Sequence, residues 1–440
     1  MPGSAEPHQA GDDAVRPRPS QLVEAIFRRE VWPWGLLGLT SGLVEGAVVA
    51  VMIKKTYGTV VSATWVNFAV ALISGAPALA NISSFAWANL AHGRARVSVL
   101  VTIQALFALV VGLVAFAPFG PAGLALTIIA VIAARLLWAG ILTVRAAVWT
   151  ANYPRAVMAR ITGRLVLVSS PGIALVALVV GWVLDRQAGL TRWLYLLAAL
   201  CGLAGAWLYR SVRVRRQYQL LSAESDAGVA GGAFNLRTVR QILRSDPHFR
   251  RFMFWMSLYG AGNLMCNAQL VVMFTDRMHL GGMTQVLLLS AVPLLVMPLV
   301  LPWWARQFDA GHVIEYRARQ CWFLVGAITA NALGIWTGQA WLLWPAALLS
   351  GVGYAGASLG WNLGHNDFAS LGQAQHYMGV HVTLTGVRGL IAPPLGMLCY
   401  EWLEAIRPGS GTLSLLIPVL LVTAGGLGFV RMRGQRRVTV

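Results

Sequence analysis

The sequence predicts an all-α integral membrane protein whose twelve transmembrane helices form two pseudo-symmetric bundles of six. Composition is the first observation: 57% of the 440 residues are hydrophobic, 11% are charged, and the mean hydropathy is +0.64. So much apolar surface cannot be hidden in a water-soluble core of this length, so lipid is the expected solvent. The second observation is that apolar runs of roughly 20 residues, the length that crosses a bilayer, follow one another almost end to end.

The chain begins with a polar stretch. Residues 1–30 are rich in proline and polar side chains and contain no apolar run of the kind that a cleavable signal peptide requires. They are predicted to form a disordered cytoplasmic tail. Glu24–Glu30, with two arginines between, is predicted to begin a short amphipathic helix at the membrane surface.

Two groups of six apolar runs follow, separated by charges and by Pro or Gly breaks. The N-terminal bundle, residues 31–208, is predicted to hold spans at 34–53, 61–86, 97–116, 122–146, 165–184 and 193–208. The C-terminal bundle, residues 252–430, is predicted to hold spans at 252–274, 283–301, 321–337, 340–364, 380–399 and 413–430.

The two bundles are joined by residues 209–251, which are predicted to form a cytoplasmic linker. This linker is rich in arginine and contains one amphipathic piece near Leu236–Leu243. Its arginines are typical of a contact with anionic lipid at the membrane surface. Residues 431–440 are predicted to form a second cytoplasmic tail.

The orientation follows from the basic residues, which are retained near span ends on the cytoplasmic side. The two tails and the even-numbered connections, with their flanks, hold 27 of the 34 Lys and Arg, and the odd-numbered connections hold 6. Arg135 lies within a span. Both termini are therefore predicted to be cytoplasmic in a bacterial-type inner membrane, although the doublet Lys54-Lys55 after the first span disagrees.

Other classes of site are disfavoured. The net charge of +18 comes from short clusters between apolar runs, without a folded basic domain, so nucleic-acid binding is not expected. The four cysteines lie in four different apolar stretches without Cys-x-x-Cys spacing, which indicates packing rather than disulfides or zinc. We expect no cofactor and no metal.

The two halves resemble each other. Thr162-Gly163 is followed nine residues later by Pro171, and Thr385-Gly386 is followed nine residues later by Pro394. Two shorter matches, Trp87-Ala88 with Trp304-Ala305 and Val51-Met52-Ile53 with Val272-Met273-Phe274, also fall in corresponding spans. Internal repeats that meet near the membrane midplane are typical of secondary transporters.

The chain resembles the major facilitator superfamily through this layout and through the loop after span 2, where that family carries Gly-x-x-x-Asp-Arg/Lys-x-Gly-Arg-Arg/Lys. Here the loop reads Ala88-Asn89-Leu90-Ala91-His92-Gly93-Arg94-Ala95-Arg96, and the counterpart after span 8 ends in Asp309-Ala310-Gly311. The resemblance implies a secondary transporter in which His92, Arg94 and Asp309 belong to a cytoplasmic gate. Arg135 followed by Gly140 resembles a further feature of the family's span 4.

Two ionisable residues fall near the middle of predicted spans, Glu45 in span 1 and Arg135 in span 4. A charge at this depth costs about 3 kcal/mol, so it needs a partner or a water-filled cavity. In the resembled family, spans 1, 4, 7 and 10 line the central cavity, so these two side chains are expected to face each other. They are predicted to couple transport to protons, the alternative being a fixed ion pair that holds the bundle together.

Polar residues on three spans are candidates for contact with the solute. Arg135, Trp138, Leu142 and Arg145 share one stripe of span 4, whose two guanidinium groups lie about 15 Å apart and suit an anionic or aromatic solute. Alternatively, Arg145 extends to the headgroups. Asn263 and Asn267 share a face of span 7, and Asn362 lies in span 10; carboxamides fit a polar cavity wall but also join helices as packing contacts.

Two further groups have no assigned ligand. Glycines repeat every four residues at Gly38, Gly42 and Gly46 and at Gly356, Gly360 and Gly364, which indicates close helix packing. The histidines His365, His376 and His381 with Asp367 surround the loop after span 10 and match no metal-ligand spacing, so hydrogen bonding in a loop or gate is expected.

The sequence therefore predicts a monomeric secondary active transporter of a small organic solute, working by alternating access and coupled to protons. A membrane-embedded transferase acting on a lipid-linked substrate is the alternative from another class, but no connection carries the Asp-x-x-x-Asp motif usual in such enzymes. A scaffold or sensor of the same fold that does not transport is a third hypothesis.

Overall fold

The structure is a computed structural model that describes residues 21–219, 221–222, 236–369 and 373–438. Residues 1–20 of the predicted N-terminal tail, most of the glycine-rich part of the linker and the last two residues lie outside the described residues. Every regular element in the described ranges is helical, and those ranges contain no β-strand.

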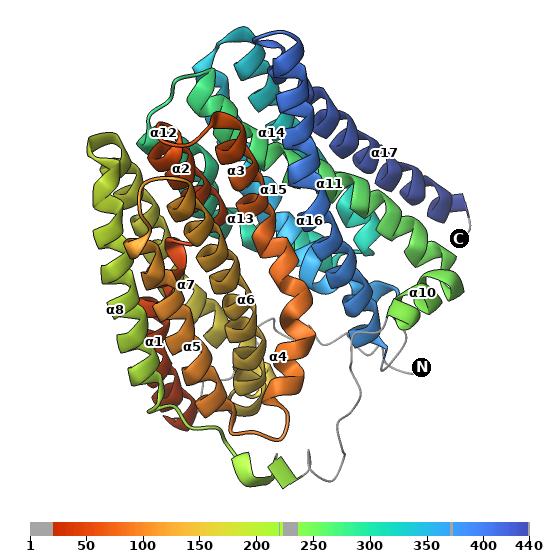
Figure 1. Ribbon diagram of the computed structural model, residues 1–440. Helices are drawn as coiled ribbons and strands as arrows, with labels where there is room; N and C mark the ends of the chain where they lie inside the picture. The colour runs from red at the N-terminus through yellow and green to blue at the C-terminus, as the bar shows by residue number, and fades with distance from the viewer. Residues whose placement is uncertain (1–20, 220, 223–235, 370–372, 439–440) are drawn as a thin grey trace, which may run out of the picture.

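The first half of the chain contains eight helices that make six long rods (Figure 1). The elements are α1 (Gln21–Gly42), α2 (Gly46–Tyr57), α3 (Ala63–Ala80), α4 (Ser84–Ala91), α5 (Arg96–Leu113), α6 (Pro121–Asn152), α7 (Arg155–Arg186) and α8 (Thr191–Tyr209). The pairs α1 with α2 and α3 with α4 each make up one rod.

The second half follows the same plan after the short linker helix α10 (Leu236–Ser245). Its rods are α11 (Pro247–Asp276), α12 (Gly282–Val286) continued by α13 (Val292–Asp309), α14 (Val313–Thr337), α15 (Leu343–Leu363), α16 (Ala374–Ile406) and α17 (Leu416–Val438). A π-helical turn, Leu287–Ala291, joins α12 to α13. It comes directly before Pro293, whose ring and missing N–H disturb the preceding turn.

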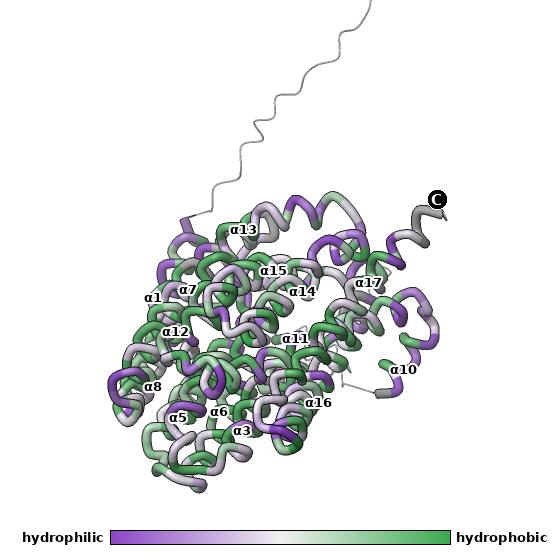
Figure 2. Tube along the Cα trace, turned by 90° about the horizontal axis from the view of Figure 1, so that it is seen from above, coloured by the Kyte–Doolittle hydropathy of each residue, from purple (hydrophilic) through white to green (hydrophobic). Residues whose placement is uncertain are grey.

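Each predicted span coincides with one rod. Within the described ranges, nine helical segments are long and apolar enough to cross a membrane. The other three rods, α7, α11 and α14, are 32, 30 and 25 residues long. Large apolar side chains such as Leu200, Trp207, Leu299 and Leu420 are exposed on the outer surface, and apolar residues run along most helices (Figure 2). A bilayer is the environment that suits this surface.

The two halves lie side by side and meet along two seams, α3 against α16 and α7 against α12. Glycines allow the close approach. A Cβ on Gly389 would lie 2.5 Å from the Cβ of Ala78 and 2.8 Å from the carbonyl oxygen of Gly75, and a Cβ on Gly181 would lie 2.8 Å from the Cα of Met283. The backbones of the two halves therefore touch at these crossings.

The glycine stripes pack as predicted. A Cβ on Gly38 would lie 3.1 Å from Ser169, and a Cβ on Gly42 would lie 3.0 Å from Val176, so both glycines let α1 approach α7. Gly356 and Gly360 make room for side chains of neighbouring helices in the same way.

Two expectations for the start of the chain are wrong. Residues 24–30 do not form a separate surface helix, because α1 runs unbroken from Gln21 to Gly42 with Val23, Ile26, Phe27 and Glu30 buried. The first span is not continuous either: the helix stops at Gly42 and restarts at Gly46, and Glu45 between them is extended, with φ −62° and ψ 132°.

A side chain of α8 satisfies a backbone group of this break, and a side chain of α1 bonds to the backbone of α8 beside it. The Tyr195 hydroxyl donates to the Leu43 carbonyl at 3.1 Å, and the Thr40 hydroxyl donates to the Ala198 carbonyl at 2.7 Å. Backbone groups freed inside a membrane need such partners, so the break is a supported feature of the fold.

Candidate functional site

The break in the first rod exposes the Glu45 carboxylate to its predicted partner. Nη2 of Arg135, on α6, lies 3.2 Å from Oε2 of Glu45. The Arg135 side chain is buried, whereas that of Glu45 is 39% exposed. Glu45 also occupies the N-cap position of α2, where the helix dipole favours a negative charge. A carboxylate with one buried counter-charge and one accessible face is suited to gaining and losing a proton.

Aromatic rings surround the second arginine of the span 4 stripe. The guanidinium of Arg145 lies 3.1 Å from the ring centroid of Trp34 and 4.1 Å from that of Trp149. Trp34 stacks on Trp138 at 5.7 Å with an interplanar angle of 17°. Arg145 is buried, so it does not extend to the headgroups, and the face that Trp138 turns to Trp34 is already occupied.

Glu30 anchors the aromatic column formed by Trp138, Trp34 and Arg145, and it was not identified from the sequence. Its carboxylate accepts hydrogen bonds from Trp149 Nε1 at 2.9 Å and from the hydroxyls of Tyr153 and Tyr209 at 2.8 Å each. The donors come from α6, from the residue after it and from α8, so no local spacing reveals them. One signal was available: Glu30 lies one turn before Trp34 on the helix that packs beside α6.

In the second half, Asn263 and Asn267 of α11 meet Tyr354 of α15. The Tyr354 hydroxyl lies 3.3 Å from Oδ1 of each asparagine. The three polar side chains are partly buried and join two helices that correspond to spans 7 and 10. Asn362 does not join them: it is exposed, and its Nδ2 donates to the Ser358 carbonyl on its own helix at 2.7 Å.

The predicted gate residues lie at helix ends. His92 follows α4, Arg94 is exposed in the loop after it, and Asp309 is exposed at the end of α13. In the part of the chain that the structure describes, no ion pair joins Arg94 to Asp309. The gate role of the three residues stays a prediction.

A polar network at the ends of the rods opposite to these gate residues joins the two halves. Lys54 Nζ lies 2.7 Å from Oδ2 of Asp276 and donates to Oδ1 of Asn67 at 2.7 Å. Nδ2 of Asn67 in turn donates to Oε1 of Glu401 at 2.6 Å. Lys54 and Asn67 belong to the first half, whereas Asp276 and Glu401 belong to the second. We call these four residues the inter-half seal.

A second contact reinforces this seal. The Asp185 carboxylate of α7 accepts hydrogen bonds from the backbone N–H groups of Gly282 and Met283 at the start of α12, at 2.5 and 3.0 Å. One hint of these contacts was visible in the sequence, the Lys54-Lys55 doublet that disagreed with the predicted orientation. Lys54 is buried in the seal and Lys55 donates to the Leu280 carbonyl, so both lysines have structural partners.

The histidine group is divided by the structure. His365 and His381 are buried inside the second half rather than exposed in a loop, and His376 is exposed. The Asp367 carboxylate accepts from the backbone N–H of Val313 at 2.6 Å. Arg317 and Arg388, counted with loop charges in the sequence, are buried in α14 and α16. Among the described residues, no group of three His, Cys, Asp or Glu could hold a metal ion.

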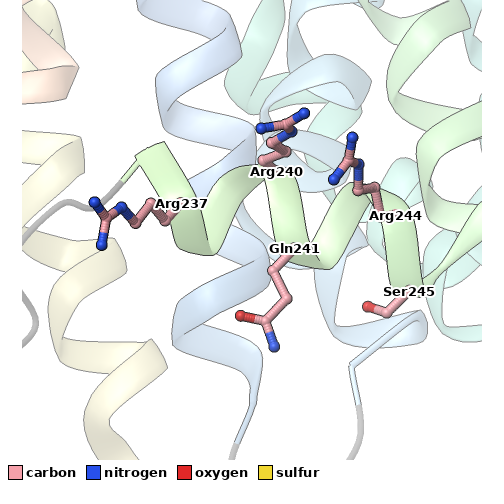
Figure 3. A pocket seen from close by; sticks show the side chains of 5 residues that line it. All are labelled: Arg237, Arg240, Gln241, Arg244 and Ser245. Atoms are coloured by element: carbon pink, nitrogen blue, oxygen red, sulfur yellow. The ribbon is translucent and has the colours of Figure 1, made fainter.

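The linker helix carries a basic surface. Arg237, Arg240 and Arg244 of α10, with Gln241 and Ser245, line an open hollow of about 580 Å³ (Figure 3). The apolar residues Val239, Ile242 and Leu243 pack against the core from the same helix. The amphipathic piece predicted in the linker is therefore confirmed, and its three arginines are exposed.

Comparisons with known proteins agree with this architecture. The family model described as Major Facilitator Superfamily matches residues 35–393. No curated protein matches the sequence.

Several solved structures have the same fold. A structure of the nucleoside transporter NupG matches with a TM-score of 0.71 at 10% identity, over 92% of this chain and 98% of that chain. A D-xylose-proton symporter matches with a TM-score of 0.69 at 12% identity, over 93% and 97%. A partially occluded inward-open structure of the xylose transporter XylE from E. coli matches with a TM-score of 0.63 at 11% identity, over 93% and 97%.

Proposed function

Because the chain belongs to the Major Facilitator Superfamily and is a multi-pass membrane transporter rather than an enzyme, we propose that it moves a small organic solute by alternating access, coupled to protons through Glu45. The family membership removes the transferase hypothesis. The transport-inactive scaffold remains as an outcome of the experiment below.

One observation carries the proposal: the Glu45 carboxylate lies in a helix break, half exposed, 3.2 Å from the buried guanidinium of Arg135. Broken helices near the midplane commonly form the ion and substrate sites of transporters. In the proposed cycle, protonation of Glu45 on one side removes its charge and weakens its attraction to Arg135. Release of the proton on the other side restores the ion pair, so proton movement is tied to the change of access.

The solute is proposed to bind between the halves, near Glu45 and the polar group of Asn263, Asn267 and Tyr354. Trp138 and Arg145 are proposed to support the solute site without touching the solute. In the aromatic column that they form with Trp34, their faces pack against protein. The similar structures belong to proteins only 10–12% identical to this chain. They support its fold, but the solutes in their names do not identify the solute of this chain.

Sidedness is proposed from the basic residues, with both termini cytoplasmic in a bacterial-type inner membrane. The seal then faces the periplasm. In this orientation Lys54 lies on the periplasmic side, where basic residues are less frequent. Its burial in an inter-half ion pair supports the orientation, because the pair explains why a lysine occurs there. A monomer is proposed, because the two halves of one chain contact each other and form the seal without a second copy.

Glu45→Gln is the experiment that tests the proposal. Proteoliposomes loaded with a pH-sensitive dye are given succinate, glutamate, tryptophan or xylose, and any solute that moves protons is then followed in radiolabelled form. Gln has nearly the same volume as protonated Glu, so the variant should fold, exchange solute across the membrane and fail to accumulate it against a gradient.

The control variant is Glu315→Gln, which removes a carboxylate from the first turn of α14, away from the break. Accumulation by Glu45→Gln at the wild-type rate would remove Glu45 from the coupling. A wild-type protein that neither exchanges nor accumulates any of these solutes would favour the scaffold.

A further inference from the structure

Four basic side chains gather inside the second half. Arg317 comes from α14, His381 and Arg388 come from α16, and His365 comes from the turn after α15. Arg317 and His381 have no exposed surface, and His365 and Arg388 are 7% and 8% exposed. His381 lies within electrostatic range of the other three.

Only neutral atoms receive the hydrogen bonds of the two arginines. Arg317 donates from Nη1 to Gln320 Oε1 at 2.9 Å and from Nη2 to the Ala357 carbonyl at 3.3 Å. Arg388 donates to the Met256 carbonyl and to the Thr385 hydroxyl. Over the described ranges, neither arginine has a carboxylate within ion-pairing distance. Of the buried cations of the first half, Arg135 and Lys54 each have one, and Arg145 lies against the rings of Trp34 and Trp149 instead.

Several polar atoms of this group lack any partner. They are Nε of Arg317, Nε of Arg388, both ring nitrogens of His381 and Nδ1 of His365. Buried polar groups are nearly always hydrogen-bonded, so five such atoms in one part of the interior indicate a missing polar ligand or water. Two uncompensated guanidinium charges indicate that the ligand is an anion, because an unpaired buried charge costs several kcal/mol.

The backbone is shaped to hold these side chains. A Cβ on Gly260 of α11 would lie 2.5 Å from Nη1 of Arg388, and a Cβ on Gly360 of α15 would lie 2.7 Å from Nε of Arg317. Both guanidinium groups thus pack directly on glycine backbone. Trp361 contacts the His381 ring edge-to-face at 5.6 Å. Residues from α11, α14, α15 and α16 therefore contribute to one site.

We propose that Arg317, Arg388 and His381 form an oxyanion-binding site inside the second half, which takes the carboxylate or phosphate group of an anion. Guanidinium groups bind both oxyanions with directed, charge-assisted hydrogen bonds. The inference rests on the proposed function in one respect: the anion is the charged group of the transported solute, which makes the protein a carrier of small anions. Arg388 packs on Gly260 and Arg317 donates to Ala357, about one helical turn from Asn263 and Tyr354, so this site adjoins the polar group near which the solute is proposed to bind. Binding of the anion supplies the negative charge that the described residues around the two arginines lack.

The experiment measures thermal unfolding of the purified full-length protein in detergent at constant ionic strength. Succinate, its neutral analogue succinamide and inorganic phosphate are titrated separately, with sodium chloride as the balancing salt. A ligand that binds only the folded state raises the melting temperature in a saturable way. We expect saturable stabilisation by succinate or phosphate and none by succinamide.

Three variants locate the effect. Arg388→Gln and Arg317→Gln should each weaken the apparent affinity at least tenfold, and without anion their melting temperatures should equal or exceed that of the wild type because a buried charge is removed. The matched control is Arg319→Gln, since Arg319 is exposed on the same helix as Arg317 and donates to Oε1 of Gln307. It should behave as the wild type.

Each outcome decides the proposal. Saturation by succinate identifies an organic carboxylate as the occupant, and saturation by phosphate alone identifies an inorganic anion. No saturable shift with either anion, or an equal shift in Arg388→Gln, would overturn the site. Glu45→Gln should keep the full anion effect, because this measurement involves no proton gradient; proton-coupled transport without an anion effect would therefore refute this site and leave the proposed function standing.

Discussion

Arg135 shows how one buried charge is accommodated in the first half. A single nitrogen, Nη2, contacts Glu45, and Nε has no hydrogen-bond partner among the described residues. The pair is therefore not the bidentate fork that arginine often forms with carboxylates. A contact through one atom with a half-exposed partner is easier to break than a fully buried, bidentate pair. This geometry favours a pair that opens during a cycle over one that only holds helices together.

Replacement of Arg135 by Met should impair gradient-driven transport. Without the guanidinium, the Glu45 carboxylate loses its ion-pair partner, so the proposed alternation between a paired and a protonated carboxylate is lost and gradient-driven uptake should fall by about tenfold or more. Arg135→Lys keeps a positive charge and should retain most of the uptake. Initial rates of uptake measured in proteoliposomes with and without a pH gradient check this. Gradient-driven uptake by Arg135→Met at the wild-type rate would show that the pair takes no part in the coupling.

At the scale of the helix, the order and approximate positions of the twelve spans were predictable because apolar length carries that information. The break at Gly42–Glu45 was not, because no proline marks it and its glycines read as a packing stripe. It is supported by Tyr195 of α8, whose hydroxyl donates to the Leu43 carbonyl across a helix contact. A contact of that kind is set by tertiary packing and leaves no local pattern.

The same reasoning applies to the candidate site. The Glu45 and Arg135 pair was predictable because each charge lies alone in an apolar span and needs a partner. The anion site was missed because both arginines were counted with the charges of the connections, although Arg388 lies within the predicted span 380–399. Arg317 lies just before the predicted span 321–337, and the helix extends further than this apolar run, α14 beginning at Val313, which brings Arg317 inside.

Substitution of Gly389 by Ala tests the crossing of α3 and α16. The added Cβ would lie 2.5 Å from Ala78 and 3.0 Å from the Leu79 nitrogen, so the two helices must separate. Overpacking of this kind costs about 1–3 kcal/mol. We expect a lower melting temperature and at least a tenfold loss of transport rate. The matched control is Gly326→Ala on α14, where the new Cβ meets only Leu349 at 3.5 Å. Equal stability of the two variants would contradict the close crossing.

At the scale of the whole molecule, the described contacts indicate a state closed at the end that carries the seal. Lys54 with Asp276, Asn67 with Glu401, and Asp185 with the start of α12 all join the two halves there. Both glycine crossings lie on the same two seams, α3 with α16 and α7 with α12. Rigid halves that touch through backbone along two seams can rock about them, and the polar contacts then decide which end is closed.

The Asp276→Asn variant should open the sealed end. It leaves the Lys54 ammonium, which is 4% exposed, with Asn67 as its remaining described partner. Asp276 is 35% exposed, so the loss is smaller than for a fully buried pair, about 1–3 kcal/mol. A change of that size shifts a two-state equilibrium by about 5- to 150-fold toward the state without the contact.

Spin labels report this shift directly. With the four native cysteines replaced by serine, labels at Val60→Cys and Ile406→Cys lie on exposed positions at the seal end of the two halves. Pulsed electron–electron double resonance should show a single short distance between the two labels in the parent protein. Asp276→Asn should add a population several ångströms longer. Glu315→Gln, which removes a carboxylate from the first turn of α14, away from the seal, serves as the control and should leave the distribution unchanged. An unaltered distribution in Asp276→Asn would mean that the Lys54 pair does not hold this end closed, and the closure would then rest on Asp185 and on the packing of the two seams.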